Sequence, residues 1–416
     1  MERKVREFTF RATAYFSATV ALLILSLVLS SEFLLMASLT GAAVLLLSLS
    51  SNTRRPTITR KLDRTRVLEG EDLKVIVDIE HRGRGGAIEL FERISQMMEI
   101  SEGSNRAMVP PGRTQLEFSV RAPLRGYHPL GPTVIRRWDP LFLWFSQETL
   151  DDLEEVTVLP RLYPGRRGAL SLKRVKERPG AMHLRRMGMG KEFHTIRDYT
   201  PTDPFNTINW KAYARTGKLL VNQYEAETVT DVIFILDARN VSRAGPVTEN
   251  PLERSIRLCA SLSSLLISGS NRVGLIVYAS SVKVMKPSGG QRAFDDLIHS
   301  LTAIESGGFN TLYSTVEYAM PYLPPEMPVV ILSSLAEDPT VKEAIRALIG
   351  RGHPLTVISP SGIDFERGLF EGPVPLYGLR TMERENLLDD IRSMGARVID
   401  WKPQDDVPWA MEEVWG

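Results

Sequence analysis

The chain has 416 residues, of which 43% are hydrophobic and 24% charged, a composition that excludes a wholly disordered chain or a fibrous repeat. Its 51 Lys and Arg residues nearly balance 50 Asp and Glu residues. Because the charges balance, the chain as a whole lacks the positive electrostatic potential that is typical of nucleic-acid-binding proteins. We therefore expect no nucleic-acid partner.

Residues 1–51 are predicted to form a two-helix transmembrane hairpin. Two apolar runs, 13–29 and 33–49, are separated by a short turn, and each is close to the ~20 residues that span a bilayer. A signal peptide would be followed by polar mature sequence, whereas here a second apolar run follows at once. Basic residues cluster at 3–11 and 54–61, which predicts a multi-pass protein of the cell membrane with most of the chain in the cytoplasm. A buried hairpin in a soluble core is the alternative, but it would not need these clusters.

Residues 52–164 are predicted to form a β-rich, sandwich-like domain. Segments 74–80, 114–120 and 156–159 alternate apolar and polar residues with the period of a strand. Gly, Pro and Arg fill the gaps between them, as in the turns of a small antiparallel sandwich. No cluster of catalytic residue types occurs in this region.

Residues 165–229 are predicted to comprise a basic linker and a distinct segment after it. The linker, 165–191, holds nine basic residues and a single acid. It is interpreted either as a solvated connection or as a docking segment for an acidic protein surface or for membrane lipid with anionic head groups. No aromatic residue interleaves these charges, which disfavours stacking on nucleic-acid bases.

Residues 230–416 are predicted to form an α/β domain, because apolar strands alternate with amphipathic helices. The predicted strands are 232–236, 273–278, 329–332, 355–358 and 397–400, and the predicted helices are 252–267, 294–304, 341–349 and 384–394. Such alternation indicates a mainly parallel, doubly wound sheet. Ligands of these sheets bind at the carboxyl edge, where Asp237, Tyr278 and Ser334 are expected.

Residues 188–221 closely resemble the signature of the domain-of-unknown-function 58 family. The signature residues are Glu192, Phe193, Arg197, Tyr199, Asp203, Trp210, Arg215 and Lys218. Thr202 stands where the family usually has Gly, and the upstream Asp139-Pro140-Leu141-Phe142 motif also looks like this family. The resemblance implies a von Willebrand factor A-like C-terminal domain. It also implies a MoxR-type AAA+ ATPase partner, with which the protein would assemble or activate other proteins.

The signature segment mixes acidic, basic and aromatic groups without a paired nucleophile and base. One interpretation is a buried ionic and aromatic network that docks the β-rich region on the α/β domain. The other is a surface for a partner. In the first case, Trp210 and Arg215 hold the segment against the rest of the cytoplasmic region.

A von Willebrand A-like fold would hold a divalent ion with an Asp-x-Ser-x-Ser loop, a distant Thr and a distant Asp. Here Arg239 and Val241 take the two Ser places, and the second carboxylate is expected to be missing. The positions of this degenerate metal loop are Asp237, Asn240, Ser242, Thr311 and Ser334. We expect an Asp237–Arg239 ion pair where the metal would lie and no cofactor, with a weak Mg²⁺ site as the alternative.

Catalysis is not expected from this sequence. It contains no P-loop and no nucleophile elbow, and Cys259, its single cysteine, lies in an apolar helix where a core thiol is expected. The predicted function is that of a membrane-anchored, cytoplasmic protein-binding scaffold or adaptor. Metal-dependent, adhesion-type ligand binding and a passive structural anchor are the alternatives.

Overall fold

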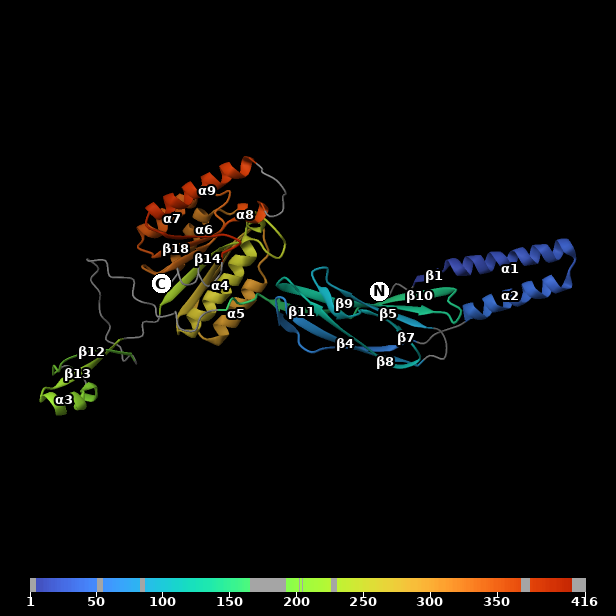
Figure 1. Ribbon diagram of the computed structural model, residues 1–416, viewed down its shortest axis with the longest axis horizontal. Coiled ribbons are helices and arrows are strands. Elements are labelled where there is room, and N and C mark those ends of the chain that lie inside the picture. Colours follow the sequence, from blue (N-terminus) through green and yellow to red (C-terminus); the bar gives the residue numbers. More distant parts are fainter. Residues whose placement is uncertain are drawn as a thin grey trace. The chain divides into compact units, whose positions relative to one another are not determined.

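The computed structural model describes residues 5–50, 55–82, 87–164, 192–201, 203, 205–225, 230–367 and 375–405. The chain divides into two compact units (Figure 1). Unit 1 comprises Met1–Arg161 with Ile298–Ile304, and unit 2 comprises Leu162–Leu297 with Glu305–Gly416. The predicted basic linker, 165–191, lies outside the described residues.

Two apolar helices open unit 1, as predicted. Helix α1 spans Phe10–Leu29 and α2 spans Glu32–Ser50, and both are long and apolar enough to cross a membrane by length and composition. Only 11% of the apolar window of each helix is buried, which is unlike a helix in a soluble core. Helix α1 begins before the predicted residue 13 because the side chain of Thr9 caps it by accepting a hydrogen bond from the Ala12 amide.

The ends of the two helices are bonded to the β-rich part of the unit. Strand β1 (Val5–Phe8), which the sequence analysis did not predict, pairs antiparallel with β10 (Trp144–Leu150). The buried carboxylate of Asp139 accepts hydrogen bonds from the backbone amides of residues 141, 143 and 144 and from the Ser48 hydroxyl of α2. The Trp144 indole also donates to the Ser48 carbonyl at 3.1 Å. The loop 139–144, called the Asp139 loop below, therefore fixes the base of the hairpin.

Two sheets enclose the core of the β-rich body. The remaining strands are β2 (Thr57–Leu62), β3 (Arg66–Leu68), β4 (Asp72–His81), β5 (Ile88–Ile94), β6 (Glu99–Gly103), β7 (Arg106–Val109), β8 (Gly112–Arg121), β9 (Gly126–Trp138) and β11 (Glu154–Leu159). One sheet has the order β2-β4-β8-β6, and the other runs β1-β10-β9-β11-β3 with β5 and β7 attached through β9. Val77 and Phe118 of the first sheet share one buried cluster with Leu90 and Leu130 of the second.

Unit 2 contains a six-stranded sheet of order β16-β15-β14-β17-β18-β19. Its strands are β14 (Asp231–Asp237), β15 (Arg272–Tyr278), β16 (Val282–Ser288), β17 (Val329–Leu332), β18 (Leu355–Pro360) and β19 (Arg397–Trp401). All neighbouring pairs are parallel except β15 with β16. The predicted strands are found, and the edge strand β16 is an addition.

Helices lie on the two faces of this sheet. They are α4 (Pro251–Ser268), α5 (Gln291–Thr302), α6 (Leu312–Ala319), α7 (Val341–Gly350), α8 (Gly362–Arg367) and α9 (Pro375–Ser393). Ile233 and Ile235 of β14 are buried with residues of α6, α7 and α9, while α4 contacts β14, β15 and β18. Helix α6 was not predicted, and α9 begins at Pro375 rather than at residue 384.

Asp139→Ala is expected to loosen the base of the hairpin. The substitution leaves three loop amides without their acceptor, so the free energy of local opening should fall by about 2–4 kcal/mol. Hydrogen exchange of the β10 amides in the full chain measures this change. Ser48→Ala is the matched control, because it removes one of the same bonds and should cost about 1 kcal/mol. Equal exchange in Asp139→Ala and the unsubstituted chain would contradict the assigned role.

Candidate functional site

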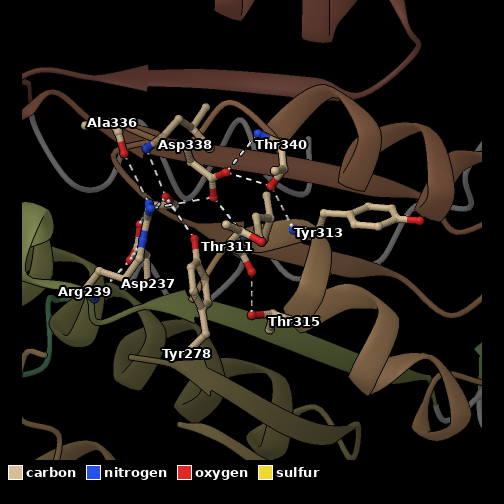
Figure 2. Close-up of polar contacts among 12 residues, drawn as sticks. Asp237, Arg239, Tyr278, Thr311, Tyr313, Thr315, Ala336, Asp338 and Thr340 are labelled. Carbon is tan, nitrogen blue, oxygen red and sulfur yellow. Dashed lines mark hydrogen bonds and ion pairs between the residues drawn. The ribbon is translucent and has the colours of Figure 1, made fainter. Parts of the chain in front are cut away.

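The carboxyl ends of the parallel strands in unit 2 bring polar side chains to one edge. Strand β14 ends at Asp237, β15 ends at Tyr278, and Ser333 follows β17 directly. The Ser333 hydroxyl donates to the Asp237 carboxylate at 2.7 Å, and the Tyr278 hydroxyl donates to Ser333 at 3.3 Å (Figure 2). Burial and the nearby Asp237 charge raise the pKa of Tyr278 well above its usual range, which keeps this hydroxyl a donor.

Arg239 lies at the centre of this edge. Its Nε and Nη2 donate to the two oxygens of Asp237 at 3.0 and 2.7 Å, and the side chain is only 4% exposed. Burial alone would lower the pKa of Arg239, but the hydrogen bonds and charge of Asp237 outweigh this effect and raise that pKa above its usual value. The guanidinium also lies 5.4 Å from the centre of the Tyr278 ring. The predicted Asp237–Arg239 ion pair is therefore present.

Asp338 supplies a second carboxylate at this edge, so the prediction that this carboxylate is missing is wrong. Its Oδ2 lies 3.6 Å from Nη1 of Arg239, and it accepts hydrogen bonds from the Leu312 amide and from Thr340 (Figure 2). The expected position was Ser334, but residues 335 and 337 adopt positive φ angles of 58° and 52°. These left-handed residues turn the loop so that the carboxylate comes from further along the chain.

The donor set at this edge does not fit a divalent ion. The guanidinium of Arg239 pairs with both carboxylates, so a cation of the chain already balances their charge. The Thr311 hydroxyl caps helix α6 by accepting a hydrogen bond from the Ser314 amide. Its oxygen is therefore already used by the helix. Within the described part of the chain, no group of three or more His, Cys, Asp or Glu side chains is arranged to hold a metal.

A groove of about 930 Å³ opens beside the ion pair. Among its lining residues are Asn240, Arg243, Ser334, Glu337, Asp338, Glu366, Arg380, Glu383 and Arg384. Its floor is held by Arg384, which donates to the carbonyls of Ser334 and Ser359 and pairs with Asp400 at 2.7 Å. Its rim carries exposed side chains at Arg243, Glu337 and Glu383.

The degenerate-loop positions differ in their surroundings. Asp237 and Ser334 lie at the ion pair and the groove, and Asn240 lines the groove as an exposed residue. Ser242 and Ser334 bury hydroxyl oxygens for which the described residues offer no hydrogen-bond partner. Thr311 is part of the α6 cap. Asp338 was missed, although its position two residues before Thr340 is typical of an Asx turn that starts a helix, here α7.

The signature segment forms a small element of its own. Strands β12 (Glu192–Asp198) and β13 (Leu220–Glu225) pair antiparallel, and helix α3 (Trp210–Thr216) precedes β13. Arg197 donates to both oxygens of Asp203 at 2.7 and 2.5 Å and holds the pKa of that carboxyl well below its usual range. The Tyr199 amide donates to the Leu219 carbonyl, which continues the strand pairing.

The aromatic part of this segment is not buried as expected. Trp210 is 51% exposed, and its ring contacts Phe205 at 5.3 Å and Tyr213 at 6.2 Å. Arg215 and Lys218 are also exposed. The side chains of Glu192 and Phe193 lie outside the described residues.

Comparison with known proteins finds a family model that matches part of the chain. Residues 195–361 match the model of the family described as "Protein of unknown function DUF58". No curated protein matches the chain. A FixG-related protein from Vibrio parahaemolyticus is 11% identical, with 25% of this chain and 97% of that chain covered and a TM-score of 0.19. Proximal thread matrix protein 1 of the mussel byssus is 12% identical, with 32% of this chain and 37% of that chain covered and a TM-score of 0.24.

Arg239→Ser is expected to convert the ion pair into a divalent-ion site. Without metal, the two buried carboxylates lose their cation and the unit should be destabilised by about 3–5 kcal/mol. Mg²⁺ or Mn²⁺ should then raise the melting temperature of this variant, because a hydroxyl and two carboxylates become available. The unsubstituted chain should not respond.

The matched control for this titration is Arg239→Ser combined with Asp237→Ala, which lacks one of the proposed ligands. It should melt at the same temperature with and without metal. Equal metal stabilisation of the unsubstituted chain would contradict the expectation that Arg239 keeps a divalent ion from binding to these carboxylates.

Proposed function

From the family match of residues 195–361 and the charged groove, we propose that this protein is a membrane-anchored, cytoplasmic adaptor that binds a protein partner. The proposed partner is a MoxR-type AAA+ ATPase, with which the adaptor assembles or activates other proteins. The role is binding, not catalysis. The single observation that carries the proposal is a groove with charged side chains on its rim, next to an edge where the buried cation is a side chain of the chain itself.

We propose further that the α/β unit is von Willebrand factor A-like. In support, Asp237, Thr311 and Asp338 lie near one carboxyl edge, in the chain order in which such a fold supplies its metal-binding side chains. Arg239 occupies the position of the ion. This arrangement supports partner binding that does not require a metal, and it disfavours the alternative of metal-dependent adhesion.

The groove has the properties of a protein-binding surface. Its floor is ordered by the hydrogen bonds of Arg384, while the rim presents Arg243, Glu337 and Glu383 to a partner. A standard interface buries about 800 Å² on each side, which the groove and its rim can contribute to. Rim charges mainly accelerate association, so binding is expected to weaken as salt increases.

The ATPase is implied by the family resemblance, and the exposed Trp210 cluster offers it a second contact surface. The rival function, a passive structural anchor, would leave the groove without a partner.

Topology is tested by reporter fusions after Ser31 and after the C-terminus of the full chain. Because basic residues flank the outer ends of the two helices, we expect an external signal at Ser31 and a cytoplasmic signal at the C-terminus. A cytoplasmic signal at Ser31, or an external one at the C-terminus, would contradict the proposed orientation.

Partner binding is tested by affinity purification with the full chain as bait. Arg243→Glu combined with Glu337→Lys reverses two exposed rim charges and should reduce recovery of the AAA+ ATPase. Lys283→Glu combined with Glu343→Lys is the matched control, since it makes the same exchange at exposed positions of β16 and α7. If no AAA+ protein is enriched over the rim variant, and a co-expressed candidate keeps the same ATPase rate with and without the chain, the adaptor function is wrong.

A further inference from the structure

Apolar side chains are exposed where the helical hairpin meets the β-rich body. In the Asp139 loop, Leu141 is 48% and Phe142 is 39% exposed. Phe8 and Phe10, at the start of α1, are 64% and 86% exposed. Large apolar side chains gathered in this way mark an interaction surface more often than isolated ones do.

A shallow apolar groove continues this surface onto the neighbouring strands. It has a volume of about 470 Å³ and is lined by Met108, Pro110, Pro111, Pro140 and Phe142, among others. Met108 is itself 52% exposed. We call Phe8, Phe10, Met108, Leu141 and Phe142 the apolar patch.

The level of the apolar patch along the hairpin is fixed by hydrogen bonds. The Thr9 amide donates to the Leu143 carbonyl at 2.9 Å, and Ser48 is bonded to both Asp139 and Trp144. Helix α1 has 20 residues, so its length is about 30 Å, the thickness of the hydrocarbon layer. When the hairpin spans that layer, the ends that hold the Asp139 loop lie at its cytoplasmic boundary.

We propose that the apolar patch inserts into the boundary between lipid head groups and acyl chains, so that the β-rich body binds the bilayer directly. The inference rests on the membrane anchoring of the proposed function. We infer that the partner of the apolar patch is lipid, because the patch is continuous with the two bilayer-length helices.

The residues around the patch have the chemistry of a membrane interface. The Trp138 ring lies 5.7 Å from the Phe142 ring and 4.8 Å from the Phe145 ring, so Phe142 of the patch packs beside an aromatic neighbour. Arg11, exposed in the first turn of α1, can extend its guanidinium to lipid phosphates while its stem stays on the apolar surface. The bilayer contact would hold the β-rich body in one orientation above the membrane.

The test uses the full chain in vesicles of phosphatidylcholine and phosphatidylglycerol that contain lipid spin-labelled near the head group. Leu141→Cys and Met108→Cys are each labelled with an environment-sensitive fluorophore. Cys259 stays unlabelled, because it is fully buried and burial raises the pKa of its thiol to about 12. Both labels are expected to shift to shorter wavelength and to lose emission when the spin-labelled lipid is present.

Tyr127→Cys is the matched control on the same unit. Tyr127 is 45% exposed and lies at the start of β9, whereas Trp138 ends that strand about 36 Å away. A label at Tyr127 should keep its emission in the same vesicles. Quenching at Tyr127 equal to that at Leu141 would overturn the proposal, because it would indicate general contact with lipid.

A label at Leu27→Cys separates this inference from the proposed function. Leu27 lies in α1 and is 71% exposed, so a spanning hairpin places it in lipid. Quenching at Leu27 but not at Leu141 and Met108 overturns the bilayer contact and leaves the anchor intact. No quenching at Leu27 means that the anchor itself fails. A shift at Leu141 that depends on protein concentration, without lipid quenching, assigns the patch to a second copy of the chain and also overturns the proposal.

Discussion

A buried guanidinium held by two carboxylates organises the carboxyl edge of the α/β unit. Arg239 bonds to Asp237 at the end of β14 and lies near Asp338 in the loop after β17, while Asp338 also accepts the Leu312 amide that begins α6. One cation thus joins three segments that are far apart in the sequence. A charge buried to this degree is tolerated only with such partners, so the loops around the groove depend on the same interaction.

A buried carboxylate performs a similar task in the other unit. Asp139 accepts hydrogen bonds from three backbone amides of its own loop and from the Ser48 hydroxyl of α2. These bonds fix the conformation of the loop and hold the end of the helix against it. Glu92 is another buried acid of that unit. Burial raises its pKa, and the charge of Arg60, which donates to it at 2.7 Å, opposes that shift. Asp139 and Asp338 order irregular backbone that apolar packing alone would not specify, whereas Glu92 joins side chains of three strands.

The parts of the structure that follow from local pattern were predictable. The two apolar helices follow from the length of their runs, and β14 follows from a continuous apolar segment. The Asp237–Arg239 pair was predictable because its partners are two residues apart. Asp338 was not, since its position depends on left-handed backbone at Leu335 and Glu337, which these residue types do not signal. Strand β1 was missed because its partner, β10, is more than a hundred residues away.

The pairing of β1 with β10 also has a consequence for biosynthesis. Phe8 of β1 pairs with Trp144 of β10, which is 136 residues further along the chain. Both helices are therefore synthesised long before β10. At about 5–20 residues per second, the first strand waits roughly 7 to 27 seconds for its partner. The nascent protein must therefore keep its first strand accessible while translation continues, and the proposed membrane insertion of the hairpin would have to precede the completion of the sheet.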